Sequence, residues 1–210
     1  LAALKQRVTA NLCVNENSYR SLPDFPALVA EHGLAQLHLD IVRPSSTGER
    51  DDAYLRELMP RYTDMAPYFR AMLEAFEAEQ PGFDVNVGNL PYCVIPEWAD
   101  RVHHGGEETV TQACDTEGLE VAVDKYEWHY SMRRHPAGCA GCVFREKCSG
   151  VYGEYLALHG EDEFRAVTED ALKAQRARRR AVKLARALHG VGGFAGWSTE
   201  PVQDGADETV

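Results

Sequence analysis

The feature that most constrains the fold is an alternation of short β-prone runs with helical stretches in the N-terminal part of the chain. The β-prone runs span residues 8–14, 37–42 and 83–87. Apolar residues recur at helical spacing in both intervals between them. Strands separated by helices are typical of parallel βαβ units. The sequence therefore predicts an α/β fold with a parallel sheet, whose ligand-binding groups lie at the carboxyl ends of the strands.

The two predicted connections carry their own helix signals. The helix in the first connection is predicted to end at His32-Gly33, because a glycine that follows a helical pattern is a typical C-cap. The second pattern begins at Asp51 or Asp52 and runs to Pro81. Prolines inside that pattern predict a kink or two consecutive helices, because proline cannot donate the helical backbone hydrogen bond. They are Pro60 and Pro67.

Three of the six cysteines lie within ten residues, at Cys139, Cys142 and Cys148. Thiolates are soft ligands that suit zinc or an iron–sulfur cluster, and each of these centres usually takes four protein ligands. The fourth is expected from Cys93, which follows a predicted strand, with Cys114 as the alternative. Spacing alone leaves zinc and a cluster both open, although zinc ribbons usually carry two CxxC pairs and this chain has one CxxC.

Charge and composition exclude several classes of protein. The net charge of −11 argues against nucleic-acid binding, because phosphate contacts need clustered cations. Residues 173–186 are an exception, with seven basic and no acidic residues. That stretch is predicted to be a solvated helix face, with RNA, an acidic peptide or an acidic surface of the same protein as alternatives. No apolar run approaches the roughly 18 residues of a membrane span, and the cysteine usage favours a cytoplasmic protein.

The cysteine run also resembles a known family. Residues 139–164, CAGCVFREKCSGVYGEYLALHGEDEF, are similar to the C-terminal SPASM or shorter twitch extension of radical SAM enzymes. That pattern has CxxC, five residues, a third cysteine, and often a glycine and a tyrosine, which Gly150 and Tyr155 match here. Residues 8–48 resemble the second half of a radical SAM barrel. NVGNLPYCVIP, residues 86–96, resembles its last strand running into the first auxiliary cysteine.

The resemblance implies a fold and a division of the chain. The fold is α/β, the C-terminal half of a partial (βα)6 radical SAM barrel, followed by a small loop-rich metal-binding α+β module and a C-terminal helix. The implied parts are the half-barrel, the auxiliary-cluster module, a basic helix and a disordered tail, at residues 1–92, 93–160, 161–190 and 191–210.

The resemblance also implies cofactors and ligands. One auxiliary [4Fe-4S] cluster would be held by Cys93, Cys139, Cys142 and Cys148. The full-length protein would carry S-adenosylmethionine and a second [4Fe-4S] cluster. Residues that would contact S-adenosylmethionine are Asn11, Asn15 and Arg43. The residues alone leave open that Asn15 only satisfies a turn and that Arg43 only pairs with Asp40 or Glu49.

Two departures from the family pattern matter. The chain contains no CxxxCxxC spacing, so it looks N-terminally truncated and is not expected to cleave S-adenosylmethionine alone. Tyr152 stands where full SPASM domains carry a further cysteine, which limits the chain to one auxiliary cluster and matches the twitch variety.

The function implied is that of a radical SAM oxidoreductase, in which a 5′-deoxyadenosyl radical abstracts hydrogen from a peptide or small-molecule substrate. An electron donor such as a flavodoxin or ferredoxin is the implied partner. The competing hypothesis is a non-enzymatic module with a structural zinc that binds a protein or nucleic acid through the basic helix.

Overall fold

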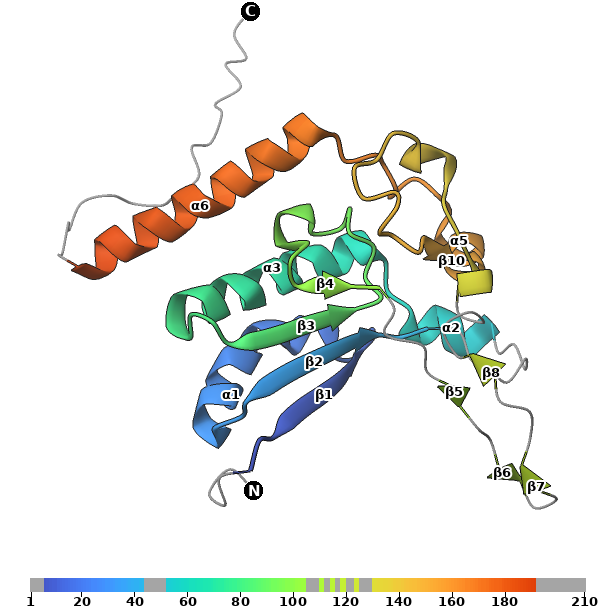
Figure 1. Ribbon diagram of the computed structural model, residues 1–210, viewed down its shortest axis with the longest axis horizontal. Helices are drawn as coiled ribbons and strands as arrows, with labels where there is room; N and C mark the ends of the chain where they lie inside the picture. Colours follow the sequence, from blue (N-terminus) through green and yellow to red (C-terminus); the bar gives the residue numbers. More distant parts are fainter. Residues whose placement is uncertain are drawn as a thin grey trace, which may run out of the picture.

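The structure is a computed structural model that describes residues 6–43, 52–104 and 130–191, with four two-residue strands between residues 110 and 124. The predicted tail beyond Val191 lies outside the described residues. Figure 1 shows the order of the elements along the chain. Within the described residues, no helix is both long and apolar enough to cross a membrane.

A four-stranded parallel sheet forms the centre of the fold, in the spatial order β1-β2-β3-β4. Its strands are β1 (Thr9–Val14), β2 (Gln36–Ile41), β3 (Asp84–Gly88) and β4 (Val102–His103). The parallel sheet and its first three strands confirm the sequence prediction. The fourth was not predicted, because two residues are too short to show alternation. Since β4 follows Cys93, the sheet includes residues on both sides of the predicted boundary at residues 92 and 93.

Helices fill both long connections, as the apolar spacing predicted. A 3-10 helix, η2 (Tyr19–Asp24), leads into α1 (Phe25–His32), which ends at Gly33 in the left-handed conformation with a φ of 61°. The second connection contains two consecutive helices, α2 (Asp52–Leu58) and α3 (Tyr62–Glu79). The break between them falls beside Pro60, whereas α3 continues through Pro67.

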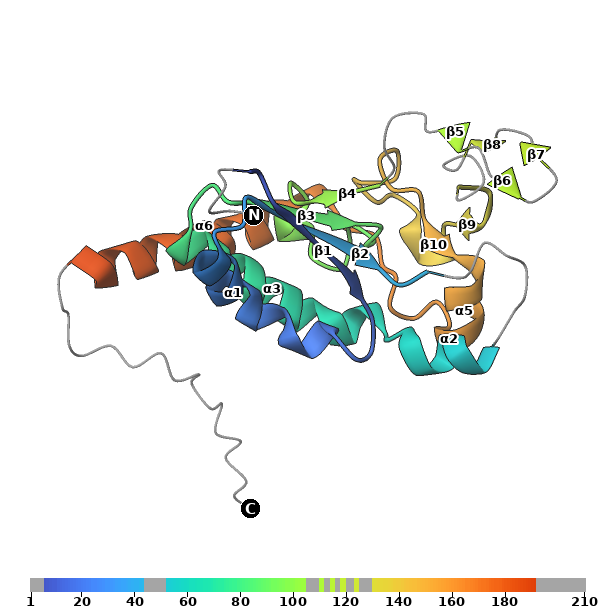
Figure 2. The same cartoon turned by 90° about the horizontal axis from the view of Figure 1, so that it is seen from below.

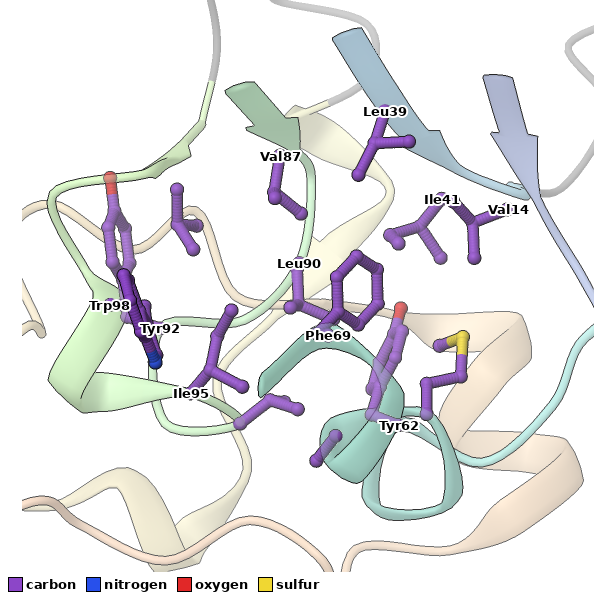
Figure 3. Close-up of a cluster of buried hydrophobic side chains, with 14 of the residues drawn as sticks. Val14, Leu39, Ile41, Tyr62, Phe69, Val87, Leu90, Tyr92, Ile95 and Trp98 are labelled. Carbon is purple, nitrogen blue, oxygen red and sulfur yellow. The ribbon is translucent and has the colours of Figure 1, made fainter. Parts of the chain in front are cut away.

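The hydrophobic core lies between one face of the sheet and α3. Alternate residues of β2 and β3 point to this face, and Figure 2 shows α1 and α3 on the same side of the sheet. Helical spacing places the apolar side chains of α3 opposite them, as the close-up in Figure 3 shows for Phe69. The buried residues of α3 include Met65, Phe69, Met72, Leu73 and Phe76, and those of the two strands are Leu37, Leu39, Ile41, Val85 and Val87.

The opposite face of the sheet is polar. Its side chains are exposed or half-buried, and within the described residues no helix lies over it in Figure 2. Parallel sheets covered on both faces have nearly continuous apolar strands, whereas these strands alternate. We call this the polar face; it is formed by Thr9, Asn11, Cys13, Gln36, His38, Asp40, Asp84 and Asn86.

The part of the chain around the three clustered cysteines contains little regular structure. A two-stranded antiparallel pair, β9 (Arg133–Arg134) and β10 (Val151–Tyr152), encloses the 3-10 helix η4 (Ala137–Cys139) in sequence and leads into α5 (Gly153–His159). The sequence did not predict α5, which is short and begins at a glycine. We call residues 130–164 the cysteine module. Along the chain, two short antiparallel pairs come after the sheet and before this module. They are β5 (Val110–Thr111) with β8 (Val123–Asp124), and β6 (Cys114–Asp115) with β7 (Gly118–Leu119).

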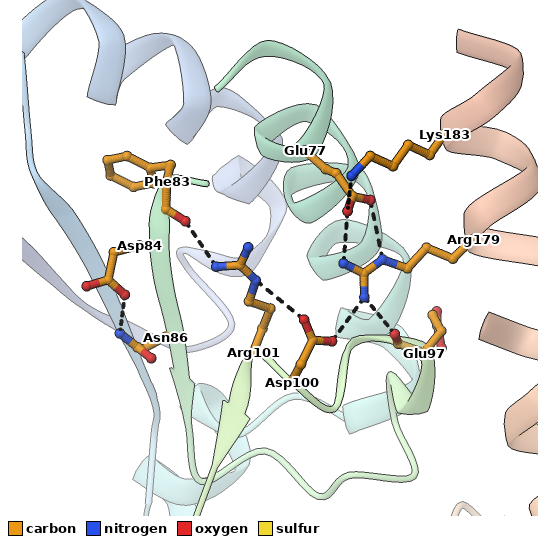
Figure 4. Close-up of polar contacts among 9 residues, drawn as sticks. All are labelled: Glu77, Phe83, Asp84, Asn86, Glu97, Asp100, Arg101, Arg179 and Lys183. Carbon is orange, nitrogen blue, oxygen red and sulfur yellow. Dashed lines mark hydrogen bonds and ion pairs between the residues drawn. The ribbon is translucent and has the colours of Figure 1, made fainter. Parts of the chain in front are cut away.

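The last helix, α6 (Glu169–Val191), carries the basic run and packs against α3 and the 3-10 helix η3 (Pro96–Trp98). It begins later than predicted because Phe164 is buried in the preceding loop. Arg179 contacts acidic residues of the same protein, pairing with Glu77 and Asp100, each at 3.0 Å (Figure 4). Most other described side chains of the run are exposed, so the predicted solvated face and the alternative of an internal acidic contact both occur.

Candidate metal centre

The CxxC segment forms a tight turn that brings its two cysteines together. Ala140 has φ and ψ of −62° and 128°, and Gly141 has a positive φ of 74°. The backbone N–H of Cys142 donates to the carbonyl oxygen of Cys139 at 3.2 Å. These values describe a type II turn, which needs a residue that tolerates positive φ at its third position. Glycine at position 141 therefore allows both cysteine side chains to leave one short turn.

Cys148 approaches the same region from the end of a folded loop. Its backbone N–H donates to the carbonyl oxygen of Phe144 at 2.8 Å, which turns the chain back after Cys142. Its Sγ accepts a hydrogen bond from the backbone N–H of Gly150 at 3.4 Å and another from the backbone of Tyr92. Tyr92 directly precedes Cys93, so Cys148 lies beside the segment that leaves β3.

All four predicted ligands lie within electrostatic range of one another. Burial, together with the charges of Cys148, Cys139 and Cys142, raises the pKa of Cys93 to about 12. Burial also raises the pKa of Cys139, as do the thiolates of Cys148 and Cys142. The pKa of Cys148 is raised by burial despite its two backbone hydrogen bonds. Thiols with raised pKa values stay protonated at neutral pH, and a bound metal ion or cluster would hold them as thiolates.

Zinc and an iron–sulfur cluster place different demands on the spacing of their sulfur ligands. A tetrahedral zinc with Zn–S bonds of about 2.3 Å holds its sulfurs roughly 4 Å apart. Among the described side chains, no three cysteine, histidine or carboxylate groups lie close enough to hold one metal ion. A cluster binds each cysteine through a different iron and so accepts more widely spaced sulfurs. Both kinds of centre take cysteine thiolates, so metal analysis decides between them.

The alternative fourth ligand, Cys114, lies in β6, which pairs with β7. Its side chain lies outside the described residues. Cys93 lies in the segment that connects β3 to β4, and its side chain packs against the hydrophobic core.

An aromatic stack joins the cysteine loop to the sheet. The ring of Tyr92 lies between His104, at 4.6 Å, and Phe144, at 5.2 Å between centroids. Both nitrogens of His104 are in use: Nε2 contacts the carbonyl oxygen of Leu90 at 2.5 Å, and Nδ1 accepts from the backbone N–H of Ser149 at 3.0 Å. Burial lowers the pKa of His104 to about 4. A neutral imidazole engaged at both nitrogens stabilises this junction and is not free to ligate a metal.

Arg133 connects the cysteine module to the carboxyl edge of the sheet. Its Nη2 donates to Asn89 Oδ1 at 2.5 Å and to the Tyr152 hydroxyl at 2.7 Å, and its Nη1 donates to the Ser149 hydroxyl. Asn89 directly follows β3 and has a positive φ of 66°, a conformation that asparagine tolerates better than most residues. Its Nδ2 donates in turn to Asp40 Oδ1 at 3.1 Å, on β2.

The residues predicted to contact S-adenosylmethionine are separated in the structure. Asn11 lies in the middle of β1 on the polar face, in register with His38. Asn15 follows β1, and its Oδ1 accepts from the Asn17 backbone N–H at 2.9 Å, so this side chain satisfies a turn. Arg43 follows β2 and is half-buried, and no hydrogen bond or ion pair joins it to Asp40 or to another described residue, while Glu49 lies outside the described residues. Asn15 and Arg43 lie at the carboxyl ends of neighbouring strands, whereas Asn11 does not.

Sequence patterns indicated Asn89, as a polar residue at the carboxyl end of a predicted strand, but neither Arg133 nor His38. Arg133 shows no motif, because its partners are 16 to 44 residues away. A signal for the polar face was present in the alternation of β2 and β3, since a parallel strand with polar alternate residues indicates an open side. His38 contacts Asp40 there, with 3.3 Å between Nε2 and Oδ2.

Comparisons of the chain with protein-family models, curated proteins and solved structures find no match. Function has to be inferred from the chain's own residues and geometry. The resemblance to radical SAM enzymes is therefore a hypothesis that the four cysteines and the polar face can support, and that metal analysis can test.

Proposed function

We propose that this chain holds one [4Fe-4S] cluster and forms the C-terminal portion of a radical SAM oxidoreductase. The observation that carries the proposal is the position of Cys93. It lies 46 residues before the CxxC turn in sequence, yet its thiol is within electrostatic range of Cys139, Cys142 and Cys148. A cluster bound there would join three cysteines of the loop-rich module to one cysteine of the segment between β3 and β4.

The polar face supports the second part of the proposal. A parallel sheet that is apolar on one face and polar on the other resembles one wall of an open barrel, with helices outside and a ligand space inside. Across β1, β2 and β3 the partners Asn11, His38 and Asn86 stand in one row. Amide and imidazole groups in such a row would bind and orient a polar substrate. This chemistry fits a peptide or a polar small molecule.

When bound, S-adenosylmethionine and its own cluster supply a radical that abstracts hydrogen, and the auxiliary cluster supplies an electron path or a structural link. Four cysteine ligands leave no open iron position, which favours the path or the link over substrate binding. The residues of this chain would position the substrate and exclude water. Leu90, Tyr92 and Ile95, which flank Cys93 in the chain, are buried in the hydrophobic core (Figure 3).

The test is metal analysis of the chain purified or reconstituted without oxygen. The proposal predicts a brown protein with about four irons and four sulfides per chain and little zinc. A colourless protein with one zinc per chain would instead support the structural-zinc module, the competing function. No bound metal under either loading condition would contradict both.

Matched cysteine variants identify the ligands. Cys142→Ser is expected to lose iron and sulfide together, because it removes one anchor of the CxxC turn. Cys13→Ser is the control, since Cys13 is an exposed thiol on the polar face of β1. It should retain the iron content of the parent chain. Equal iron in both variants would show that the sulfurs of the cysteine module are not the ligands.

The absence of a CxxxCxxC spacing leads to a separate expectation. This chain alone should release no 5′-deoxyadenosine from S-adenosylmethionine under reducing conditions, even when fully loaded with iron. Detection of that product by liquid chromatography would show that other residues of the chain hold the cleaving cluster.

A further inference from the structure

We infer that Arg133 is a positioning residue that supplies the counter-charge of the proposed cluster and raises its reduction potential. The inference rests on the proposed function, because it needs a cluster at the four cysteines. It assigns a role to a residue that is not a cluster ligand. The contacts of Arg133 at the carboxyl edge of the sheet would then influence the reduction potential of the cluster.

Within the part of the chain that the structure describes, the contacts of Arg133 are to neutral groups. Its hydrogen-bond partners are the amide oxygen of Asn89 and the hydroxyls of Ser149 and Tyr152. The guanidinium carbon also lies 4.3 Å from the centroid of the Tyr152 ring. Among the described residues, no carboxylate lies within ion-pair distance of Arg133, whereas Arg134 pairs with Glu161 and Arg179 pairs with Glu77.

The positive charge of Arg133 is also partly removed from water. The side chain is half-buried, and its Nε is buried without a hydrogen-bond partner in the described structure. A buried charge without an opposite partner is costly. The cluster and its four thiolates carry a net negative charge, and they would supply the missing partner.

The position of Arg133 gives its charge access to the ligands. Ser149, which it contacts, directly follows Cys148 in the chain. Burial is the main influence on the pKa of Cys148 and raises it, while the charge of Arg133 lowers it. The field of Arg133 therefore reaches one of the four proposed ligands.

The direction of the effect follows from charge. Reduction adds one electron to a centre that is already negative, and a nearby cation stabilises the reduced form more than the oxidised form. Arg133 should therefore make reduction easier. Its hydrogen bond to Asn89, the residue after β3, holds the guanidinium of Arg133 in place. The position of Asn89 would therefore determine the electric field that Arg133 exerts on the cluster.

The experiment is a redox titration of the anaerobically reconstituted full chain, followed by electron paramagnetic resonance of the reduced cluster. Arg133→Gln removes the charge and keeps hydrogen-bonding capacity. We expect the equilibrium constant for reduction to fall on the order of tenfold, about 59 mV more negative for one electron. Arg133→Lys keeps the charge and should remain close to the parent. Arg7→Gln, which alters a cation at the opposite end of the sheet beside Asp84, should change nothing.

A second variant covers a failure of Arg133→Gln to fold. Asn89→Asp keeps Arg133 and gives it a carboxylate partner, so the potential should also become more negative. If Arg133→Gln loses iron while Arg133→Lys retains it, the dependence on charge is likewise supported. An unchanged potential in Arg133→Gln, or an equal shift in Arg133→Lys, would overturn the inference while leaving the cluster in place. A parent chain that binds no iron would overturn the proposed function itself.

Discussion

The backbone N–H of Tyr62 donates a hydrogen bond to the phenol oxygen of Tyr155 at 2.7 Å, across 93 residues of sequence. The hydroxyl of Tyr155 in turn donates a hydrogen bond to Glu163 Oε1 at 2.8 Å. The other oxygen of Glu163 accepts from the backbone N–H of Thr63 at 2.9 Å. The first turn of a helix has backbone N–H groups without intrahelical partners, and here the cysteine module satisfies two of them. The module and the sheet layer are therefore joined at the start of α3.

Tyr155→Phe tests this junction. The variant keeps the ring, which stacks on Tyr62 with 4.0 Å between centroids, but removes the oxygen that the buried N–H of Tyr62 requires. A buried donor without a partner costs about 1–3 kcal/mol, and urea unfolding should show a loss of that size. Tyr68→Phe is the control, because the hydroxyl of Tyr68 has no hydrogen bond among the described residues and its ring packs on Tyr19. Equal stability of the two variants would contradict the role of the Tyr155 hydroxyl.

Arg179 is expected to fix α6 to the rest of the protein. Its guanidinium lies 3.5 Å from the centroid of the Trp98 ring and pairs with Glu77 and Asp100. Arg179→Ala should lower the free energy of unfolding by about 2 kcal/mol and speed amide exchange in α6. Arg178→Ala changes an exposed neighbour that has no partner in the described structure, and it should leave both measurements near the parent values. If exchange in α6 is the same in both variants, other contacts hold the helix.

Glu77 should make stability depend on acid pH. Partial burial raises its pKa, but hydrogen bonds and charges from Arg179 and Lys183 lower it by more, so the pKa lies below its ordinary value of 4.5. A carboxyl group with a lowered folded-state pKa stabilises the fold above its unfolded-state pKa, and this contribution is lost as pH falls through the folded-state value. Glu77→Gln should therefore destabilise the protein more at pH about 7 than at pH about 3.

The comparison for that pH series is Glu79→Gln, which changes an exposed residue without an ion pair among the described residues. Its difference from the parent should stay small at every pH. A Glu77→Gln difference that is constant with pH would show that the carboxylate charge of Glu77 does not contribute to folding.

Gly88→Ala tests the close approach at the carboxyl edge of the sheet. A methyl group at position 88 would overlap the carboxylate of Asp40 on the neighbouring strand. Asp40 would have to move and lose its hydrogen bond from Asn89, at a cost of about 1–3 kcal/mol. Gly153→Ala is the control, because its new methyl group would meet only the Met132 carbonyl oxygen, at an ordinary 3.8 Å. An unchanged free energy of unfolding in Gly88→Ala would show that the Asp40 side chain can move aside at little cost.

Sequence patterns predicted the strands and helices that are long enough to show periodicity. β1, β2, β3, α1 and the two-helix connection all carry several apolar residues at regular spacing. Neither β4 nor α5 was predicted. The two residues of β4 and the seven residues of α5 are too few to show a clear periodicity of apolar residues. The end of α6 at Val191, directly before Gly192, agrees with the glycines at positions 190, 192 and 193 that predicted its stop.

The site was predictable only where it follows from local sequence. The CxxC turn is local, because Gly141 permits it and four consecutive residues form it. The contacts of Arg133 and the capping of α3 by Glu163 join distant segments, and neither leaves a pattern in the sequence. Asn15 makes the local turn contact that was the alternative to a ligand contact, and its contact with S-adenosylmethionine stays a prediction.

The central claim is that Cys93, five residues after the end of β3, completes a cluster with three cysteines of the module. Iron per chain after anaerobic reconstitution, measured in parallel on Cys93→Ser and Cys114→Ser, tests it most directly. We predict that Cys93→Ser loses most of the iron and its visible absorption, whereas Cys114→Ser retains the parent content. Full iron in Cys93→Ser together with its loss from Cys114→Ser would contradict the claim.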